Sequence, residues 1–455
     1  MNLNWVGLIG LGLSGALVVA AQEVVIPDAG LEAAVRDTLH KPEGPLTESD
    51  LLNLTTLVAI NRNIASLQGL EAARNLSFLA LQENNFVNVA VPSQLTNLAV
   101  LSFAGNALTN FVLPTTLTKL QSVDVSNNQL TSLIVPPELI ALSSLDGSQN
   151  EIGNFELPAA LTNISSLNLF FNQLTNLTLP DGLENLSELD LSFNQLETLA
   201  LPGGLEHLEF LHVRQNHLGR TELPNDLTGL SYLDLGENQL TNAMLPNSLG
   251  QLSILRLSGN RSLTDLTIPE GLTNLTAIFL RSNGLTNLSL PSTLQKLHSL
   301  DVLDNQLANL PLPLGMSNLV DLFVSGNLLN TLTIQRDMTN LDWLTLQGNP
   351  IANLVLPDYI ASTNLLAYVA TLPSSGTAIF TYPQIPQLLP EREIFEGRYQ
   401  ARFAGAPGVY SVFGSGDLSQ WNQVGSVTNS SAAAVFNDLT IGNVERRFYR
   451  VQLIR

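Results

Sequence analysis

A group of aromatic, arginine, histidine and aspartate residues between positions 170 and 281 contains the side chains best suited to hold another molecule. Many of them lie about 22 residues apart: Phe170, Asp190, Phe193, Phe210, His212, Arg214, Tyr232, Asp234, Arg256, Phe279 and Arg281. Exposed rings and guanidinium groups beside carboxylates are typical of the residues that dominate binding at protein interfaces. The group therefore predicts a recognition surface. The alternative is that these side chains only cover the surface and stack on one another.

Other kinds of chemistry are poorly represented in the sequence. We find no nucleophile–base pair, phosphate-binding glycine loop or metal-spaced cluster, so we expect neither an enzyme, a cofactor nor a metal site. A column of Asp124, Asp146, Asp190 and Asp234 could coordinate Ca²⁺ through carboxylates, but solubility is the simpler interpretation. The chain has no cysteine, which excludes disulfides and thiolate chemistry.

The elements that would position these residues follow from a repeated phrase, Leu-x-x-Leu-x-Leu-x-x-Asn. Its first residues are Leu54, Leu76, Leu98, Leu120, Leu142, Ile164, Leu186, Leu208, Leu230, Leu252, Leu275, Leu297, Leu319 and Leu341. Each step is 22 residues long, except the step of 23 between Leu252 and Leu275. A fixed period of this length predicts a solenoid, because one unit cannot bury its apolar face without its neighbours.

Within each unit the leucines of the phrase predict a short strand with one buried side. Leu79 and Leu81 should point inward, so that Phe78, Ala80 and Gln82 point outward. Stacking such strands predicts a parallel sheet whose outward side presents the aromatic and arginine group. The asparagine that closes the phrase should satisfy backbone groups where the chain leaves the sheet.

The second half of each unit predicts extended or 3₁₀ structure instead of long helices. Leu130, Leu133 and Val135 return apolar groups to the core, and Pro136, like its equivalents elsewhere, forbids a central helical turn. Gly147 replaces a core leucine, and we expect the larger Phe155 to lean into the gap. The longer unit should form a local bulge at residues 260–263.

The flanking segments differ from the repeats. Residues 1–21 are expected to be a secretory signal peptide cleaved near Ala21, and no second apolar run is long enough to span a membrane. Residues 22–53 should form two short capping helices, with Asp28 and Thr47 as N-caps. We expect the solenoid over 54–366, a C-terminal cap and linker over 367–390, and an antiparallel β-sandwich over 391–455.

The composition narrows the range of partners. The chain has 45% hydrophobic and only 13% charged residues, and its formal net charge is −20. Basic residues are scarce in the repeats, which argues against nucleic acid and against an anionic membrane surface as partners.

The repeat phrase resembles that of the leucine-rich repeat superfamily, and the leader from Ile26 to Thr47 looks like the cap of bacterial secreted, internalin-like members. The tail, with Trp421 and the closing run from Arg446 to Val451, resembles a C-terminal β-module of secreted bacterial proteins. The resemblance implies a mainly β fold with short helices: a right-handed solenoid of about 14 repeats with a concave parallel sheet. Families of this type bind proteins or glycans on the concave face.

Two functions follow as hypotheses. The first is a secreted or surface-exposed, non-enzymatic protein that recognises a protein or glycan on its concave face. The alternative is a structural or assembly component of the cell surface, attached through residues 391–455. The sequence leaves the ligand and the oligomeric state open.

Overall fold

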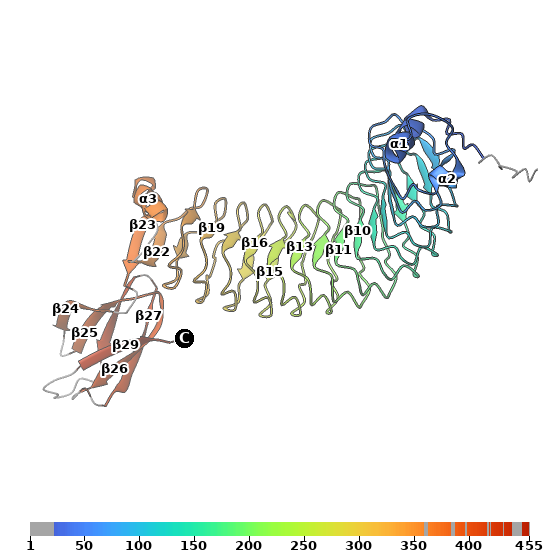
Figure 1. The fold of residues 1–455 in the computed structure, drawn as a ribbon. Coiled ribbons are helices and arrows are strands. Elements are labelled where there is room, and N and C mark those ends of the chain that lie inside the picture. Colours follow the sequence, from blue (N-terminus) through green and yellow to red (C-terminus); the bar gives the residue numbers. More distant parts are fainter. Residues whose placement is uncertain are drawn as a thin grey trace, which may run out of the picture.

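A computed structural model describes residues 22–358, 363–383, 387–395, 398–415, 418, 420–430, 432–438 and 448–454. The expected signal peptide, residues 1–21, lies outside the described residues. The fold is mainly β, with a long parallel solenoid and a small antiparallel module after it (Figure 1).

Two short helices cover the first repeat, and both begin at the predicted N-caps. In α1 (Ala29–Leu39) the Asp28 carboxylate accepts from the backbone N–H of Leu31 at 3.0 Å. The same carboxylate accepts from the N–H groups of Ala65 and Ser66, so it also ties the helix to the first turn of the solenoid. In α2 (Glu48–Leu51) the Thr47 hydroxyl and the Asp50 carboxylate form a capping box.

The solenoid is built on one parallel sheet of 14 strands, one from each repeat, with every strand beside its neighbours in the chain's repeat order. The strands are β1 (Thr56–Val58), β2 (Phe78–Ala80), β4 (Val100–Ser102), β6 (Ser122–Asp124), β8 (Ser144–Asp146), β10 (Ser166–Asn168), β11 (Glu188–Asp190), β12 (Phe210–His212), β13 (Tyr232–Asp234), β14 (Ile254–Arg256), β16 (Ala277–Phe279), β18 (Ser299–Asp301), β19 (Asp321–Phe323) and β21 (Trp343–Thr345). The central residue of each strand is buried, as the two-residue period predicted.

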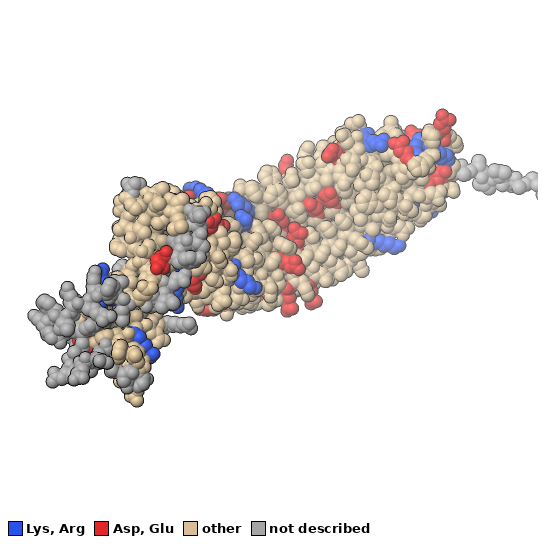
Figure 2. Space-filling model, turned by 60° about the vertical axis from the view of Figure 1, so that its left-hand side comes forward, with Lys and Arg blue, Asp and Glu red and all other residues tan. Residues whose placement is uncertain are grey.

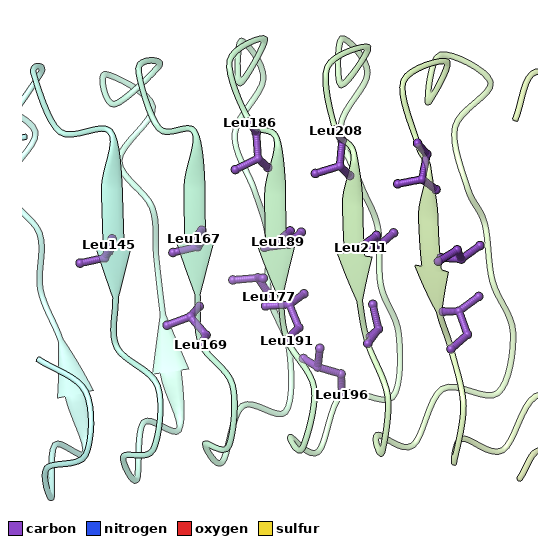
Figure 3. Close-up of a cluster of buried hydrophobic side chains, with 14 of the residues drawn as sticks. Leu145, Leu167, Leu169, Leu177, Leu186, Leu189, Leu191, Leu196, Leu208 and Leu211 are labelled. Atoms are coloured by element: carbon purple, nitrogen blue, oxygen red, sulfur yellow. The ribbon is translucent and has the colours of Figure 1, made fainter. Parts of the chain in front are cut away.

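The core is a stack of leucines at equivalent places in successive repeats. Leu145, Leu167, Leu189 and Leu211 lie side by side on successive strands of the sheet (Figure 3), and each is at most 1% exposed. Burying such a side chain contributes roughly 1.5–3 kcal/mol. Because every repeat contributes several, the apolar stack is the main force that holds the coil together.

The closing asparagines form a second, polar stack beside the leucines. The amide of Asn194 donates to the carbonyls of Leu169 and Leu191 at 2.9 and 3.0 Å, and its oxygen accepts from the N–H of Leu174 at 2.9 Å. Leu169 and Leu174 belong to the preceding repeat, so each asparagine joins two repeats. This confirms that buried amides satisfy the backbone where the chain leaves the sheet.

The opposite side of the solenoid is extended, as the prolines indicated. It carries β3 (Asn88–Ala90), β5 (Asn110–Val112), β7 (Ser132–Leu133), β9 (Asn154–Phe155), β15 (Asp265–Thr267), β17 (Asn287–Ser289), β20 (Thr331–Thr333) and β22 (Asn353–Pro357). A short 3₁₀ helix, η1 (Leu70–Ala72), lies in the first repeat. Neighbouring strands on this side again pair in parallel.

The two irregular repeats are accommodated locally. A Cβ atom added to Gly147 would lie 3.1 Å from Leu133 and 3.4 Å from Leu169, with Ile152 next, so these neighbours close the gap instead of Phe155. Phe155 is buried on β9 and pairs with Leu133. In the 23-residue repeat, Asn283 accepts from the N–H of Asn260, whereas Asn305 accepts from Leu285, 20 residues before it. The extra residue is therefore taken up in the turn, as expected.

A helix replaces the next strand at the C-terminal end of the sheet. In the preceding repeat, the N–H of Val324 donates to the carbonyl of Thr345 on the following strand. The equivalent N–H of Leu346 donates instead to the Tyr368 hydroxyl of α3 (Thr363–Thr371), at 3.0 Å. Burial raises the pKa of that hydroxyl. After η2 (Leu372–Ser375), β23 (Ala378–Tyr382) pairs with β22 and extends the opposite side.

The C-terminal module contains two antiparallel three-stranded sheets within the described residues. One consists of β24 (Gln387–Phe395), β25 (Arg398–Ala404) and β28 (Ala433–Asp438), the other of β27 (Asn422–Asn429), β26 (Gly408–Ser415) and β29 (Phe448–Leu453). Phe403 and Ala434 of the first sheet pack against Tyr410 of the second. This shared core makes the module a β-sandwich. Its first strand begins at Gln387, before the boundary expected at 391.

Candidate binding surface

The outward side of the 14-stranded sheet, here called the sheet face, presents the first and third residues of each strand. The central residue of each strand points into the core, so these flanking positions are left partly or fully exposed in most repeats. Because the strands pair in register, equivalent residues form columns across the face. Charged side chains are sparse over much of the solenoid surface, as the view in Figure 2 shows.

Four of the predicted residues interlock as a row across strands β12 to β16. The His212 and Tyr232 rings lie 4.7 Å apart with 31° between their planes. The Arg256 guanidinium carbon lies 4.4 Å from the centre of the Phe279 ring and 6.0 Å from that of Tyr232. We call these four residues the ring–arginine row. Stacking and cation–π contacts of this kind fix the orientation of the side chains.

Asp234, predicted as an exposed binding residue, is instead a buried support for the row. It is 6% exposed, accepts from the N–H of Gly236 at 2.9 Å and lies 3.5 Å from the Tyr232 hydroxyl. The pKa of Tyr232 is raised by burial and, secondarily, by the charge of Asp234. The carboxylate therefore positions Tyr232 and is not itself free to meet a ligand.

The acidic column has the same structural role in other repeats. The carboxylates of Asp124, Asp146, Asp190 and Asp301 each accept from the backbone N–H two residues further along the chain. This contact, typical of aspartate at a turn, ends each strand. Among the described residues no group of three histidines or acids could hold a metal ion. In the sequence, the pattern that marks this capping contact is an aspartate at the end of a strand, two residues before serine, glycine or leucine.

Two of the predicted arginines are paired with acids of the next repeat. Arg214 lies 3.5 Å from Glu237, and Arg281 lies 3.4 Å from Asp304. Both pairs are exposed, so each contributes at most about 1 kcal/mol. Their charges are locally balanced.

A cluster of three phenylalanines lies in the repeats before the row, and one of them, Phe171, is not among the residues predicted from the sequence. Phe170 and Phe193 are 5.2 Å apart, and Phe171 lies 6.0 and 6.1 Å from them. Phe171 and Phe193 have φ angles of 54° and 59°, in the left-handed region that bulky residues avoid. The equivalent residue is left-handed in every repeat, and it is Glu83, Gln149, Gln215 or Glu237 in some repeats and Asn127 or Gly259 in others, so this backbone is a feature of the repeat itself. Phe171 and Phe193 are the only aromatic residues at this position of the fourteen repeats, all of which the structure describes, and a phenylalanine is more strained there than asparagine or glycine.

Substituting Phe171 by asparagine tests whether this strain is real. Phe171 is 54% exposed, so little burial is lost, and asparagine adopts the left-handed backbone readily. We expect Phe171→Asn to raise the free energy of unfolding by about 0.5–1 kcal/mol, measured by urea denaturation. Phe171→Val, which is apolar but β-branched, should lower it by about 1 kcal/mol or more. A stability loss with asparagine would show that the rings pack for stability.

The structure thus divides the predicted residues into two adjacent groups. Phe170 and Phe193 belong to the phenylalanine cluster, and Phe210, which is 40% exposed, lies beside Tyr232 at the start of the row. Asp190 lies beside His212 on the neighbouring strand, and its carboxylate caps the end of its own strand. A solenoid with this leucine phrase, asparagine stack and single parallel sheet defines a leucine-rich repeat protein.

The comparison with known families agrees and is more specific. The sequence matches the family described as "BspA type Leucine rich repeat region" over residues 75–199, 147–255, 192–303 and 235–351, which together span more than half of the chain. This protein therefore belongs to the BspA-type leucine-rich repeat family. No curated protein matches the sequence.

Solved structures share the fold at low sequence identity. The functional domain of InlJ from Listeria monocytogenes is 21% identical, with 83% of this chain and 94% of that chain covered and a TM-score of 0.59. The internalin inlF from Listeria monocytogenes is 23% identical, with 80% and 98% covered and a TM-score of 0.54. YopM, a leucine-rich effector protein from Yersinia pestis, is 25% identical, with 73% and 90% covered and a TM-score of 0.55.

These likenesses establish an internalin-like leucine-rich repeat architecture. InlJ is described as including a cysteine ladder, whereas this chain has no cysteine and joins its repeats through asparagines. Among the described residues, no helix has the length and apolar character needed to cross a membrane.

Proposed function

We propose that this chain is a secreted or surface-exposed binding protein, without catalytic activity, that recognises a protein or glycan on the sheet face. The observation that supports the proposal best is the ring–arginine row with the phenylalanine cluster beside it. Rings and an arginine fixed by mutual contacts lose little conformational freedom on binding, so such residues contribute strongly to affinity.

Secretion is supported by the sequence of residues 1–21, and the non-catalytic role by the chemistry of the face. The carboxylates of the third strand position that could act as acids or bases, such as Asp190 and Asp234, accept backbone N–H groups. They therefore serve the fold.

The proposal is tested by a triple variant, Phe210→Ala, Tyr232→Ala and Arg256→Ala. The wild-type protein is screened against arrays of glycans and of extracellular proteins, and the affinity for each hit is measured. We expect the variant to bind at least tenfold more weakly with an unchanged circular dichroism spectrum, because truncating central aromatic and arginine residues commonly costs about 2 kcal/mol each.

A matched triple variant on the opposite side controls for general loss of apolar surface. Val112, Ile134 and Met244 are 53%, 62% and 72% exposed, and their replacement by alanine should leave affinity unchanged. Equal affinity of the wild-type protein and the sheet-face variant would reject the proposal.

The alternative, attachment through the C-terminal module, has one supporting observation. The Arg450 guanidinium lies 4.9 Å from the centres of both the Phe413 and the Trp421 rings. The double variant Trp421→Ala and Arg450→Ala of the full chain separates the two functions. If this variant loses the partner and the sheet-face variant keeps it, the module is the attachment site.

A further inference from the structure

Arg256 differs from the other two arginines in the middle of the sheet face because it has no acidic partner. Arg214 and Arg281 are paired with Glu237 and Asp304. Among the described residues, no carboxylate lies within ion-pair distance of Arg256, and its guanidinium donates no hydrogen bond. The nearest candidate in register, Asp234, is already engaged by Gly236.

The guanidinium is nevertheless held in place. Its carbon lies 4.4 Å from the Phe279 ring centre and 6.0 Å from that of Tyr232. Its Nε atom is buried without any hydrogen-bond acceptor. A buried donor left unpaired costs about 1–3 kcal/mol, and such a group in a folded protein calls for an explanation. The two Nη atoms are not among the buried atoms, so they are the oriented and unpaired donors that an acceptor outside the protein can reach.

The surroundings of Arg256 determine which acceptor fits. The first outward positions of four adjacent strands, Phe210, Tyr232, Ile254 and Ala277, pair in register and form an apolar strip beside the arginine. Ile254 and Ala277 offer no side-chain hydrogen bond, which disfavours the many hydroxyl groups of a sugar. A planar carboxylate matches the donor geometry of a guanidinium.

We propose that Arg256 binds an aspartate or glutamate side chain of a protein partner, whose neighbouring apolar residue lies on the Phe210–Tyr232–Ile254–Ala277 strip. The inference rests on the proposed function and specifies the chemistry of the partner at that site. It also favours selectivity, because a chain with a net charge of −20 repels acidic segments in general, and an acidic partner is retained only where a cation such as Arg256 receives it.

The test uses an array of synthetic twelve-residue peptides in matched pairs. Each acidic peptide carries one glutamate or aspartate beside leucine or phenylalanine, and its twin carries glutamine or asparagine instead. We expect the wild-type protein to bind the acidic peptides at least tenfold more strongly than their twins. In Arg256→Gln the ratio of the affinity for an acidic peptide to the affinity for its amide counterpart should fall to near one.

Arg220→Gln is the matched control, since it removes the charge of an arginine that is paired with an acid, Glu222, and that lies outside the predicted recognition surface. The preference for acidic peptides should survive in this variant. The proposal is overturned if the wild-type protein shows no preference for the acidic peptides, if Arg256→Gln keeps that preference, or if Arg220→Gln loses it equally. Arg256-dependent binding of an oligoglucuronate, without peptide binding, would also overturn it and assign the site to an anionic glycan.

Failure of this inference can be told apart from failure of the proposed function. If the triple alanine variant loses its partner while Arg256→Gln keeps the wild-type peptide preference, the binding surface stands and the carboxylate assignment falls. If the triple variant binds its partner as the wild type does, the surface itself is rejected.

Discussion

Replacing Asn216 by alanine is expected to lower the free energy of unfolding by about 3–5 kcal/mol. Its side-chain amide donates to the carbonyls of Leu191, Val213 and Arg214 at 3.0, 3.3 and 3.3 Å, and its oxygen accepts from the N–H of Leu196 at 2.9 Å. The residue is 5% exposed. Alanine would leave these backbone groups unpaired in the interior, and each unpaired group costs about 1–3 kcal/mol before local relaxation.

Urea denaturation and amide hydrogen exchange measure this effect. Because each repeat contacts only its neighbours, exchange of the Leu196 N–H should accelerate, whereas that of Leu130, bonded to Asn150 at 2.9 Å, should not. Asn185→Ala is the control, since Asn185 is exposed and donates to one carbonyl, that of Thr162. It should cost less than about 1 kcal/mol. Equal losses in both variants would show that the buried stack has no special role.

Replacing Phe103 by alanine is expected to cost about 3–5 kcal/mol as well, through a cavity. The Phe103 ring is fully buried and lies edge-on to Phe86 at 5.1 Å and to Phe111 at 5.7 Å. These three rings occupy the interior of the second and third repeats, where most repeats use aliphatic side chains. Removing the central ring leaves the other two without a partner.

The control variants separate the ring contacts from simple burial. Phe103→Leu introduces the residue found at this position in seven of the fourteen repeats and should cost roughly half as much as alanine. Phe78→Ala removes a ring that is 37% exposed on the sheet face and should cost less than about 1.5 kcal/mol. Thermal unfolding reports all three. A loss below about 1.5 kcal/mol for Phe103→Ala would mean that the neighbouring side chains collapse into the space.

The solenoid could be predicted because its determinants are local and repeated. The spacing of Leu76, Leu79 and Leu81, and of their equivalents, decides which side of each strand is buried, and fourteen copies leave no ambiguity of register. The asparagine stack followed for the same reason. The helix caps at Asp28 and Thr47 depend on residues three positions apart, which the sequence displays directly.

The features that escaped prediction depend on distances between repeats. The space beside Gly147 is closed by Leu133 and Leu169, which belong to the two adjacent repeats, so the pattern within one repeat does not reveal it. The Tyr368 hydroxyl takes the place of a strand carbonyl as the acceptor for the N–H of Leu346, which lies 22 residues earlier, and no local sequence pattern predicts this contact.

The candidate surface also combines features that are set within one repeat with features that depend on contacts between repeats. Its position on the outward face followed from the two-residue period, but the role of each residue did not. Asp234 accepts a backbone N–H, and Phe171 belongs to the aromatic cluster. Arg256 differs from Arg214 and Arg281 in its ion-pair contacts, which depend on residues of other repeats. Whether these residues bind a partner remains a prediction.

The asparagine stack gives the solenoid a direction. Each asparagine reaches back to the repeat before it: Asn216 completes the hydrogen bonds of Leu191 and Leu196, which the seventh repeat cannot satisfy alone. During synthesis the amino-terminal repeats emerge first. The asparagine of each new repeat then pairs the free backbone groups of the repeat before it, while the equivalent groups of the new repeat stay unpaired until the next repeat is made. We therefore expect the repeats to assemble in order from the amino-terminal end, and at the other end of the sheet the Tyr368 hydroxyl of α3 accepts the N–H of Leu346 in place of a further strand.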